Sequence, residues 1–136
     1  MTFTDEELAY LRSQRLGRLA SVADDGQPDN AAVGFRVADD GVITIGGMDL
    51  AGSRKGRNVW AGNRKVAFLV DDLVSIEPWR PRGLRVYGVA ELVDASGDPP
   101  HGGHLLVAPR LSWSWGIEDS AATPGFTPHR TVHRAT

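Results

Sequence analysis

Strict alternation of apolar and polar residues, interrupted by two aspartate–glycine pairs, constrains the fold of this chain more than any other feature. Over residues 16–37 this period of two predicts two strands that turn at Asp25-Gly26, because the dipeptide favours a tight hairpin. A second pair, Asp40-Gly41, leads into an apolar run at residues 42–47. We therefore expect the chain to open with a meander of three antiparallel strands.

A capping box precedes the first strand. Thr4 is expected as the N-cap, with Glu7 three residues later, of a helix over about residues 4–13. A second short helix is expected over about residues 51–61. Two glycines lower the helix propensity of that segment, so we expect tertiary packing to hold it.

The second half of the chain holds further runs of strand length. Strands are expected at residues 65–72 and 84–94, and a bent strand, or a pair broken at Pro109, at residues 104–118. Six or so strands with two short helices favour a small antiparallel barrel or sandwich. A barrel also closes the strand edges that invite aggregation.

The length of the chain indicates one domain. With 136 residues it can bury a single core, which we expect within residues 1–118. Residues 119–136 contain few core-forming side chains. We expect them to form a flexible C-terminal tail.

Composition and charge exclude several classes of function. The chain has no cysteine, which excludes disulfides, iron–sulfur clusters and thiol nucleophiles. Its formal net charge of −2 gives no overall field toward nucleic acid or acidic membranes, and we expect neither as a partner. The N-terminus does not resemble a signal peptide, and no apolar run reaches membrane-spanning length. We therefore expect a soluble, cytoplasmic protein.

Two histidine pairs are the only pattern that suggests a metal site. His101 and His104 stand three residues apart, and His129 and His133 stand four apart. At these spacings two histidines bind a metal only if they share a helix face. The first pair lies among prolines and glycines and the second in the expected tail, so we expect no metal.

The most concentrated charge lies in residues 53–65. Five of the fifteen lysines and arginines fall here with no acidic residue among them, namely Arg54, Lys55, Arg57, Arg64 and Lys65. Ser53 places a hydroxyl at the start of the expected helix, where unpaired N–H groups favour an anion, and Asn58 shares a helix face with Lys55. This pattern is typical of a phosphate clamp. A solvated basic face without a ligand explains it equally well.

Two further features suit a bound planar ring. Gly34, between Val33 and Phe35, would let a ring approach the backbone closely, although a bulge in an ordinary strand is the simpler interpretation. Trp79 lies in the turn-rich segment before a strand and is the candidate for a gate beside the ring.

The order strand, glycine pair, helix, Ser-Arg-Lys and strand resembles the pyridoxamine 5′-phosphate oxidase-like split-barrel superfamily. Within it, the chain is similar to the small actinobacterial branch of deazaflavin (coenzyme F420)-dependent members. The resemblance extends over most of the chain and is carried by residues 4–11, 16–26, Gly34-Phe35, Ser53-Arg54-Lys55, Asn58, 63–71, 79–88 and 114–118.

For the fold, the resemblance implies a mainly β architecture, namely a six-stranded antiparallel split β-barrel of the FMN-binding type with short flanking helices. It also implies a homodimer with the cofactor in a groove at the subunit interface. The residues implied for the phosphate are Ser53, Arg54 and Lys55, with Asn58 near the phosphate end. Val33, Gly34 and Phe35 are implied to back the ring, and Ile45 and Gly46 to touch the cofactor.

For the function, the resemblance implies a coenzyme F420-dependent reductase that transfers hydride to a small planar or conjugated acceptor. The cofactor performs this chemistry, so no catalytic acid or base is expected from the protein. The alternatives are an FMN-dependent oxidase or reductase, and a carrier of the cofactor or of haem that does not turn over.

Three departures from the oxidases argue against pyridoxamine phosphate oxidase activity. Their arginine–lysine pair on the second strand falls at about Asn30 and Phe35, with Arg36 as the nearest substitute. Their later-strand glutamine is Gly83 here, and their C-terminal arginine motif is absent. These gaps weaken FMN as the cofactor and suit the deazaflavin branch better.

Overall fold

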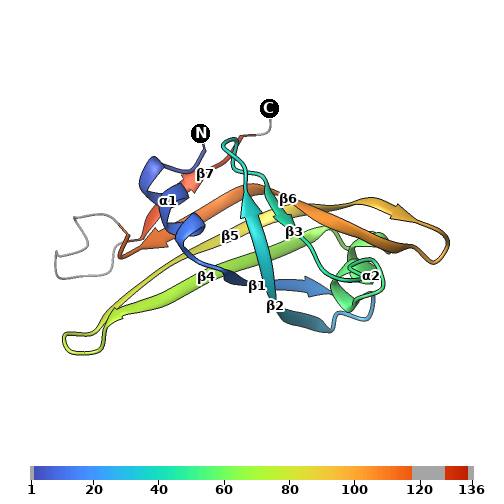
Figure 1. Cartoon of the computed structure of the whole chain (residues 1–136), viewed down its shortest axis with the longest axis horizontal. Coiled ribbons are helices and arrows are strands. Elements are labelled where there is room, and N and C mark those ends of the chain that lie inside the picture. The colour runs from blue at the N-terminus through green and yellow to red at the C-terminus, as the bar shows by residue number, and fades with distance from the viewer. Residues whose placement is uncertain (1, 118–127, 135–136) are drawn as a thin grey trace.

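A computed structural model describes residues 2–117 and 128–134 of the chain. Two short helices and seven strands follow one another in it (Figure 1). Their order is α1 (Asp5–Ser13), β1 (Leu16–Val22), β2 (Pro28–Val37), β3 (Ile43–Ile45), α2 (Arg54–Trp60), β4 (Lys65–Ser75), β5 (Arg80–Ser96), β6 (His101–Trp115) and β7 (His129–Val132). In this part of the chain neither helix has the length and apolar character that crossing a membrane requires.

The first six strands close into an antiparallel barrel. They follow the order β3-β2-β1-β4-β5-β6, and β3 pairs again with β6, so the sheet returns to its first strand. β7 pairs with the part of β6 that β3 does not reach. This confirms the six-stranded barrel with short helices that the family resemblance implies, and it decides for the barrel where the strand pattern left a sandwich open. Closure leaves few strand edges exposed.

Both predicted aspartate–glycine turns are present and share one geometry. In the first, Gly26 has a φ of 88° and the N–H of Gln27 donates to Asp25 Oδ1 at 3.0 Å. In the second, Gly41 has a φ of 92° and the N–H of Val42 makes the same bond to Asp40 at 3.0 Å. Glycine adopts the left-handed backbone without strain, and aspartate closes the turn with its own carboxylate.

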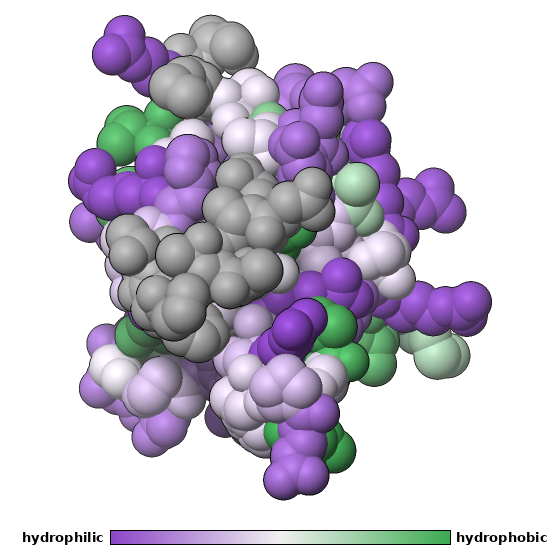
Figure 2. Space-filling model, turned by 90° about the vertical axis from the view of Figure 1, so that its left-hand side faces the viewer, coloured by the Kyte–Doolittle hydropathy of each residue, from purple (hydrophilic) through white to green (hydrophobic). Residues whose placement is uncertain are grey.

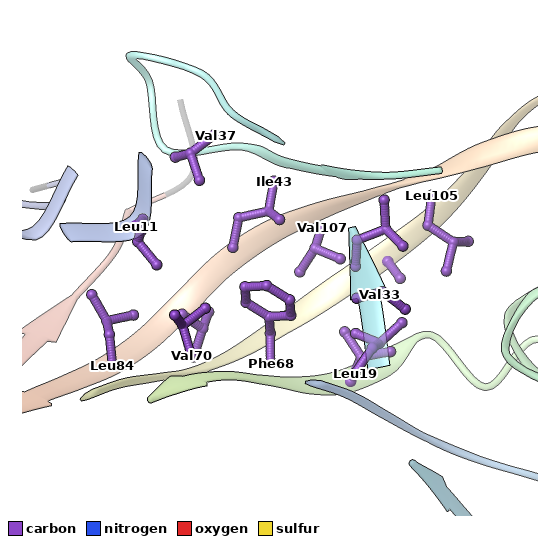
Figure 3. Packing of buried hydrophobic residues seen from close by; sticks show 14 of the residues in the cluster. Leu11, Leu19, Val33, Val37, Ile43, Phe68, Val70, Leu84, Leu105 and Val107 are labelled. Carbon is purple, nitrogen blue, oxygen red and sulfur yellow. The ribbon is translucent and has the colours of Figure 1, made fainter. Parts of the chain in front are cut away.

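The barrel interior is filled by alternate residues of every strand (Figure 3). Phe68 stands at its centre with no exposed surface, and its ring lies where a side chain at Gly17 would otherwise be. Burying one such side chain contributes about 1.5–3 kcal/mol. The other fully buried members are Leu11, Leu19, Ile43, Ile45, Val70, Leu84, Val86, Ala90, Leu105 and Val107.

The helices close the two ends of the barrel, and their starts follow from capping. Thr4 and Glu7 form the predicted capping box of α1. α2 begins at Arg54 rather than near residue 51, because the hydroxyl of Ser53 accepts from the N–H of Gly56 at 3.3 Å and so defines the N-cap.

Strands β5 and β6 are longer than the sequence predicts. Residues 80–83, expected within a turn-rich segment, already belong to β5, and the turn itself occupies residues 76–79 only. Pro109 does not divide β6, because a bulge leaves Arg110 unmatched between the pairs Tyr87–Leu111 and Gly88–Pro109. A bulge accommodates a residue that has no N–H to donate.

Part of the expected flexible C-terminal tail forms a strand in the structure. Residues 118–127 and 135–136 lie outside the described residues, but His129–Val132 forms β7 on the edge of β6. Thr131 and His133 are buried there. A strand edge recruits backbone N–H and C=O groups whatever the side chains are, so the low apolar content of the segment did not reveal this pairing.

Candidate cofactor site

The loop from Gly46 to Ser53 joins β3 to α2 and lies at one end of the barrel (Figure 1). Leu50 and Ala51 anchor it, each with 1% of its surface exposed. The N–H of Ala51 donates to the carbonyl of Gly102 at 2.9 Å, which ties the loop to the start of β6. The predicted phosphate residues therefore follow a loop that is packed and hydrogen-bonded.

Ser53 is engaged within this loop. Its hydroxyl donates to the carbonyl of Leu50 and accepts from the N–H of Gly56. To donate to a phosphate oxygen, the hydroxyl must release Leu50. The structure thus assigns Ser53 to capping α2, and any contact with a phosphate would be additional.

Arg54 and Lys55 stand in the first turn of α2, with Arg54 exposed and Lys55 half-buried. Within residues 2–117 and 128–134, no carboxylate lies within ion-pair distance of Arg54, Lys55 or Arg57. Arg64, by contrast, turns away from the group and donates from Nε to the carbonyl of Ala90 at 2.9 Å. Arg64 and Lys65 also have no carboxylate partner among the described residues, but only Arg54, Lys55 and Arg57 stand together on α2. These three form a local concentration of positive charge that favours an anion.

Asn58 has a structural partner that the sequence did not reveal. Only 6% of its surface is exposed, and its Nδ2 donates to Ser21 Oγ at 3.0 Å. Ser21 lies on β1 and is itself buried. This side-chain bond holds α2 against the barrel beneath the cations.

The residues predicted to back a ring fall on two faces of the sheet. Val33 and Ile45 point into the core, and Phe35 packs edge-on against Phe68 with ring centroids 5.0 Å apart. Gly34 and Gly46 face outward, and a Cβ on either would meet no atom within 4 Å. The outer surface there offers a ring bare backbone rather than apolar side chains.

Leu16 is a neighbour of this surface that sequence reasoning missed. It pairs with Gly34 across β1 and β2, and 60% of its surface is exposed. Since directly paired residues point to the same face, Leu16 flanks the open glycine surface. Its place as the first residue of an alternating strand was the available clue.

Trp79 lies far from these residues within one chain. It stands in the turn at the tip of the β4–β5 hairpin, which extends to the opposite side of the molecule from α2 (Figure 1). The tip is apolar and exposed, with 65% of Trp79 and 72% of Ile76 accessible. Figure 2 views the molecule from this side and shows apolar atoms between hydrophilic ones on its surface.

The root of this hairpin is fixed to α1. Tyr10 Oη donates to Asp72 Oδ1 at 2.9 Å, and Arg82 donates to both oxygens of Asp72, from Nε at 2.7 Å and from Nη2 at 2.9 Å. The bonds from Arg82 hold the pKa of Asp72 below its usual value, and burial raises the pKa of Tyr10. These groups are satisfied by one another and serve the fold.

A concavity of about 310 Å³ lies between α1 and β2. Arg12 on its wall donates to the carbonyl of Val37 at 3.0 Å and to Asp39 at 2.8 Å. Its lining is completed by Leu11, Gln14, Phe35 and Arg36.

In the described residues no three histidines or carboxylates gather as metal ligands.

Comparisons with known proteins agree with this architecture. The family model described as pyridoxamine 5′-phosphate oxidase matches residues 3–107. A protein of Streptomyces rimosus subsp. rimosus, named 5a,11a-dehydrotetracycline/5a,11a-dehydrooxytetracycline reductase, is 40% identical over 128 residues, which cover 90% of this chain and 89% of that protein. The chain belongs to the pyridoxamine 5′-phosphate oxidase family.

Solved structures of low identity share the fold. The conserved hypothetical protein Rv2991 of Mycobacterium tuberculosis superposes with a TM-score of 0.69 at 22% identity, covering 93% of this chain and 92% of its own. A haem-binding protein of Mycobacterium smegmatis gives 0.68 at 15% identity over 98% of this chain and 60% of its own. A protein named F420 reductase gives 0.54 at 24% identity over 71% and 87%.

Packing explains one departure from the oxidase pattern. Gly83 stands where the oxidases carry a glutamine, and a Cβ on it would clash with the indole of Trp115, its partner on β6. Trp115 thus occupies the space that a longer side chain at position 83 would need. Asn30, at about the position of the first residue of the oxidases' arginine–lysine pair, is exposed on β2.

Proposed function

We propose that this chain is a coenzyme F420-dependent reductase that passes hydride to a small planar or conjugated acceptor. Two likenesses support the proposal. A relative at 40% identity is named a reductase of dehydrotetracyclines, and a solved structure of the same fold is named an F420 reductase. The main structural support is the group of cations on α2, which have no carboxylate partner among the described residues. The loop that leads to them starts at an open surface around two glycines.

These residues fit an anionic cofactor with a flat ring. Arg54 and Lys55 supply donors for charge-assisted bonds, which are roughly twice as strong as bonds between neutral groups. Gly34 and Gly46 leave bare the outer backbone that any Cβ would cover. A cofactor with phosphate at one end and a ring at the other matches this division.

The deazaflavin supplies the hydride chemistry when it is bound. The chain's own residues bind the cofactor and orient its ring. Arg54 and Lys55 hold the anionic end, while Gly34 and Gly46 let the ring lie against the backbone. Ser53 and Asn58 keep α2 in place, through the cap and through the bond to Ser21.

We further infer that the functional unit is a homodimer. Trp79 sits on the far side of the chain from α2, so it would reach a cofactor held there only from a second copy. The outer face of β5 and β6 has the residue types that dominate protein interfaces, with Arg85 4.4 Å above the ring of Trp113 and Tyr87 edge-on to that ring. Sedimentation at micromolar concentration tests this, and a monomer would contradict it.

The test of function is a titration of the purified protein with coenzyme F420 and, in parallel, with FMN, followed by quenching of tryptophan fluorescence. Saturable binding of coenzyme F420 and not of FMN is expected. The reduced coenzyme, added with 5a,11a-dehydrotetracycline or another conjugated acceptor, should then be oxidised as its hydride passes to the acceptor. Preference for FMN would replace the proposal by the FMN-dependent alternative. Binding of the deazaflavin without oxidation by any acceptor would leave a carrier.

The double variant Arg54→Ala/Lys55→Ala identifies where the cofactor binds. Its Kd for coenzyme F420 should rise at least about tenfold, because two charge-assisted contacts are lost, while its melting temperature stays close to wild type. The matched control is Arg110→Ala/Arg130→Ala, which removes the same charge from exposed positions on β6 and β7. If both variants bound coenzyme F420 equally weakly, the loss of affinity would be due to overall charge and not to the position of Arg54 and Lys55.

A further inference from the structure

Asp49 holds the loop that precedes the cations. Its Oδ1 accepts from the N–H of Gly102 at 2.8 Å and from the N–H of Gly52 at 3.3 Å. The bond to Gly102 links positions 53 residues apart and joins the loop to the start of β6. Beside it, the N–H of Ala51 donates to the carbonyl of the same glycine.

The loop has little room to adopt another path. A Cβ on Gly52 would clash with the carboxylate of Asp49, and a Cβ on Gly56 would clash with the carbonyl of Leu50. The N–H and the hydroxyl of Ser53 both donate to that carbonyl. The start of α2 is therefore positioned by contacts that converge on residues 49–52.

The charge of Asp49 is unfavourable for an anion site unless it has another role. A carboxylate five residues before Arg54 weakens the positive potential there, since like charges repel through a partly screened medium. Bonds from the backbone N–H of Gly102 and Gly52, together with the nearby His101, lower its pKa against an opposing effect of desolvation. The carboxylate is thus ionised at neutral pH and directed at the backbone donors of its own loop and of β6.

We infer that Asp49 is a positioning residue for the cofactor, acting through the backbone of residues 50–53 on Arg54 and Lys55. This inference rests on the proposed function, because it assumes that these two cations bind the anionic end of the cofactor. Asp49 touches neither cofactor nor acceptor. It couples the tip of the β5–β6 hairpin to the start of α2, so the hairpin takes part in binding without contacting the ligand.

Two substitutions separate positioning from charge. Asp49→Asn keeps an oxygen that accepts from both N–H groups, whereas Asp49→Ala removes both bonds. If Asp49 positions the cations, Asp49→Ala raises the Kd and the KM for coenzyme F420 about tenfold with kcat at saturation unchanged, and Asp49→Asn stays within about threefold of wild type. Tighter binding by both variants would show that only the charge matters and would overturn the inference.

A second measurement tests the inference without turnover. Amide hydrogen exchange in Asp49→Ala should accelerate at Gly52, Ser53 and Gly102 and stay unchanged in β4 and β5. Unchanged exchange at these three amides would overturn the inference, even if wild type bound no coenzyme F420 and the proposed function failed. Glu91→Ala is the matched control, because it removes an exposed carboxylate on β5 and should change neither readout.

Discussion

The two ends of the barrel are both closed by a short helix above a buried polar pair, but they differ in the charged side chains at the surface. At the α1 end, Glu7, Ser112 and His133 are buried, and His133 Nε2 lies 2.8 Å from Ser112 Oγ. At the α2 end, Arg54 and Arg57 are exposed without carboxylate partners among the described residues. Buried, paired groups stabilise one structure, whereas exposed like charges favour association with an anion.

The buried polar residues at the α1 end are partly supplied by β7 and the residue that follows it. β7 lies beside α1 (Figure 1). His133 follows this strand, and the ring of Phe3 contacts it edge-on with 4.6 Å between centroids. Glu7 Oε1 accepts from the N–H of Thr4, while Glu7 Oε2 and Thr131 Oγ1 are buried with no hydrogen-bond partner in the part of the chain that the structure describes. This polar cluster, Glu7, Ser112, Thr131 and His133, is enclosed by α1, β6 and β7, so we expect changes there to alter stability and not binding.

The largest effect is expected from His133→Ala. It removes a packed ring and leaves the buried hydroxyl of Ser112 without its partner, so the free energy of unfolding should fall by about 2–4 kcal/mol. Urea denaturation measures this. His129→Ala, at an exposed position of β7, is the control and should change stability little. A loss of cofactor affinity in folded His133→Ala would break the division between the two ends.

Gly56→Ala should affect both stability and binding. The added methyl would press on the backbone of Leu50 and Ala51, which can move only if the loop moves, at an expected loss of about 1–3 kcal/mol. Because the same movement displaces Arg54 and Lys55, we expect the Kd for coenzyme F420 to rise as well. Arg57→Ala serves as a control for stability. Wild-type affinity in a destabilised Gly56→Ala would show that loop position does not matter for binding.

Gly46→Ala should weaken binding without changing stability. Its methyl would project into open space, so the free energy of unfolding should stay within about 0.5 kcal/mol of wild type. A ring that lies on this backbone would be displaced, however, and we expect the Kd for coenzyme F420 to rise several-fold. Chemical denaturation and fluorescence titration of the same sample separate the two effects. Unchanged affinity would remove the glycine surface from the proposed site.

The smallest effect concerns pH. Burial lowers the pKa of His133 below its ordinary value, against an opposing effect from Glu7. The unfolded chain therefore binds a proton at a higher pH than the native protein does. Stability is full above about pH 6.5 and falls as the pH drops toward the native pKa, with a slope of at most about 1.4 kcal/mol per pH unit. His133→Gln should flatten the profile between pH 7 and 5, and an unchanged slope would place its origin elsewhere.

Much of the barrel could be predicted because its signals are local. The capping box of α1, both aspartate–glycine turns and the alternation of each strand depend on residues within a few positions of one another. The same alternation already placed Val33 and Phe35 on the face opposite Gly34. Applied strictly, it would have divided the predicted ring-binding residues into core and surface before the structure was known.

The sequence by itself thus determined the individual strands, the turns between them and the position of the cations, since hydrophobic period, turn chemistry and charge are properties of neighbouring residues. Only the tertiary structure decided how the ends are built. The bonds from Asn58 to Ser21, from Gly102 to Asp49 and between Ser112 and His133 join residues 21 to 53 positions apart. Which polar groups meet over such distances depends on the order of the strands around the barrel, and patterns of neighbouring residues do not determine that order.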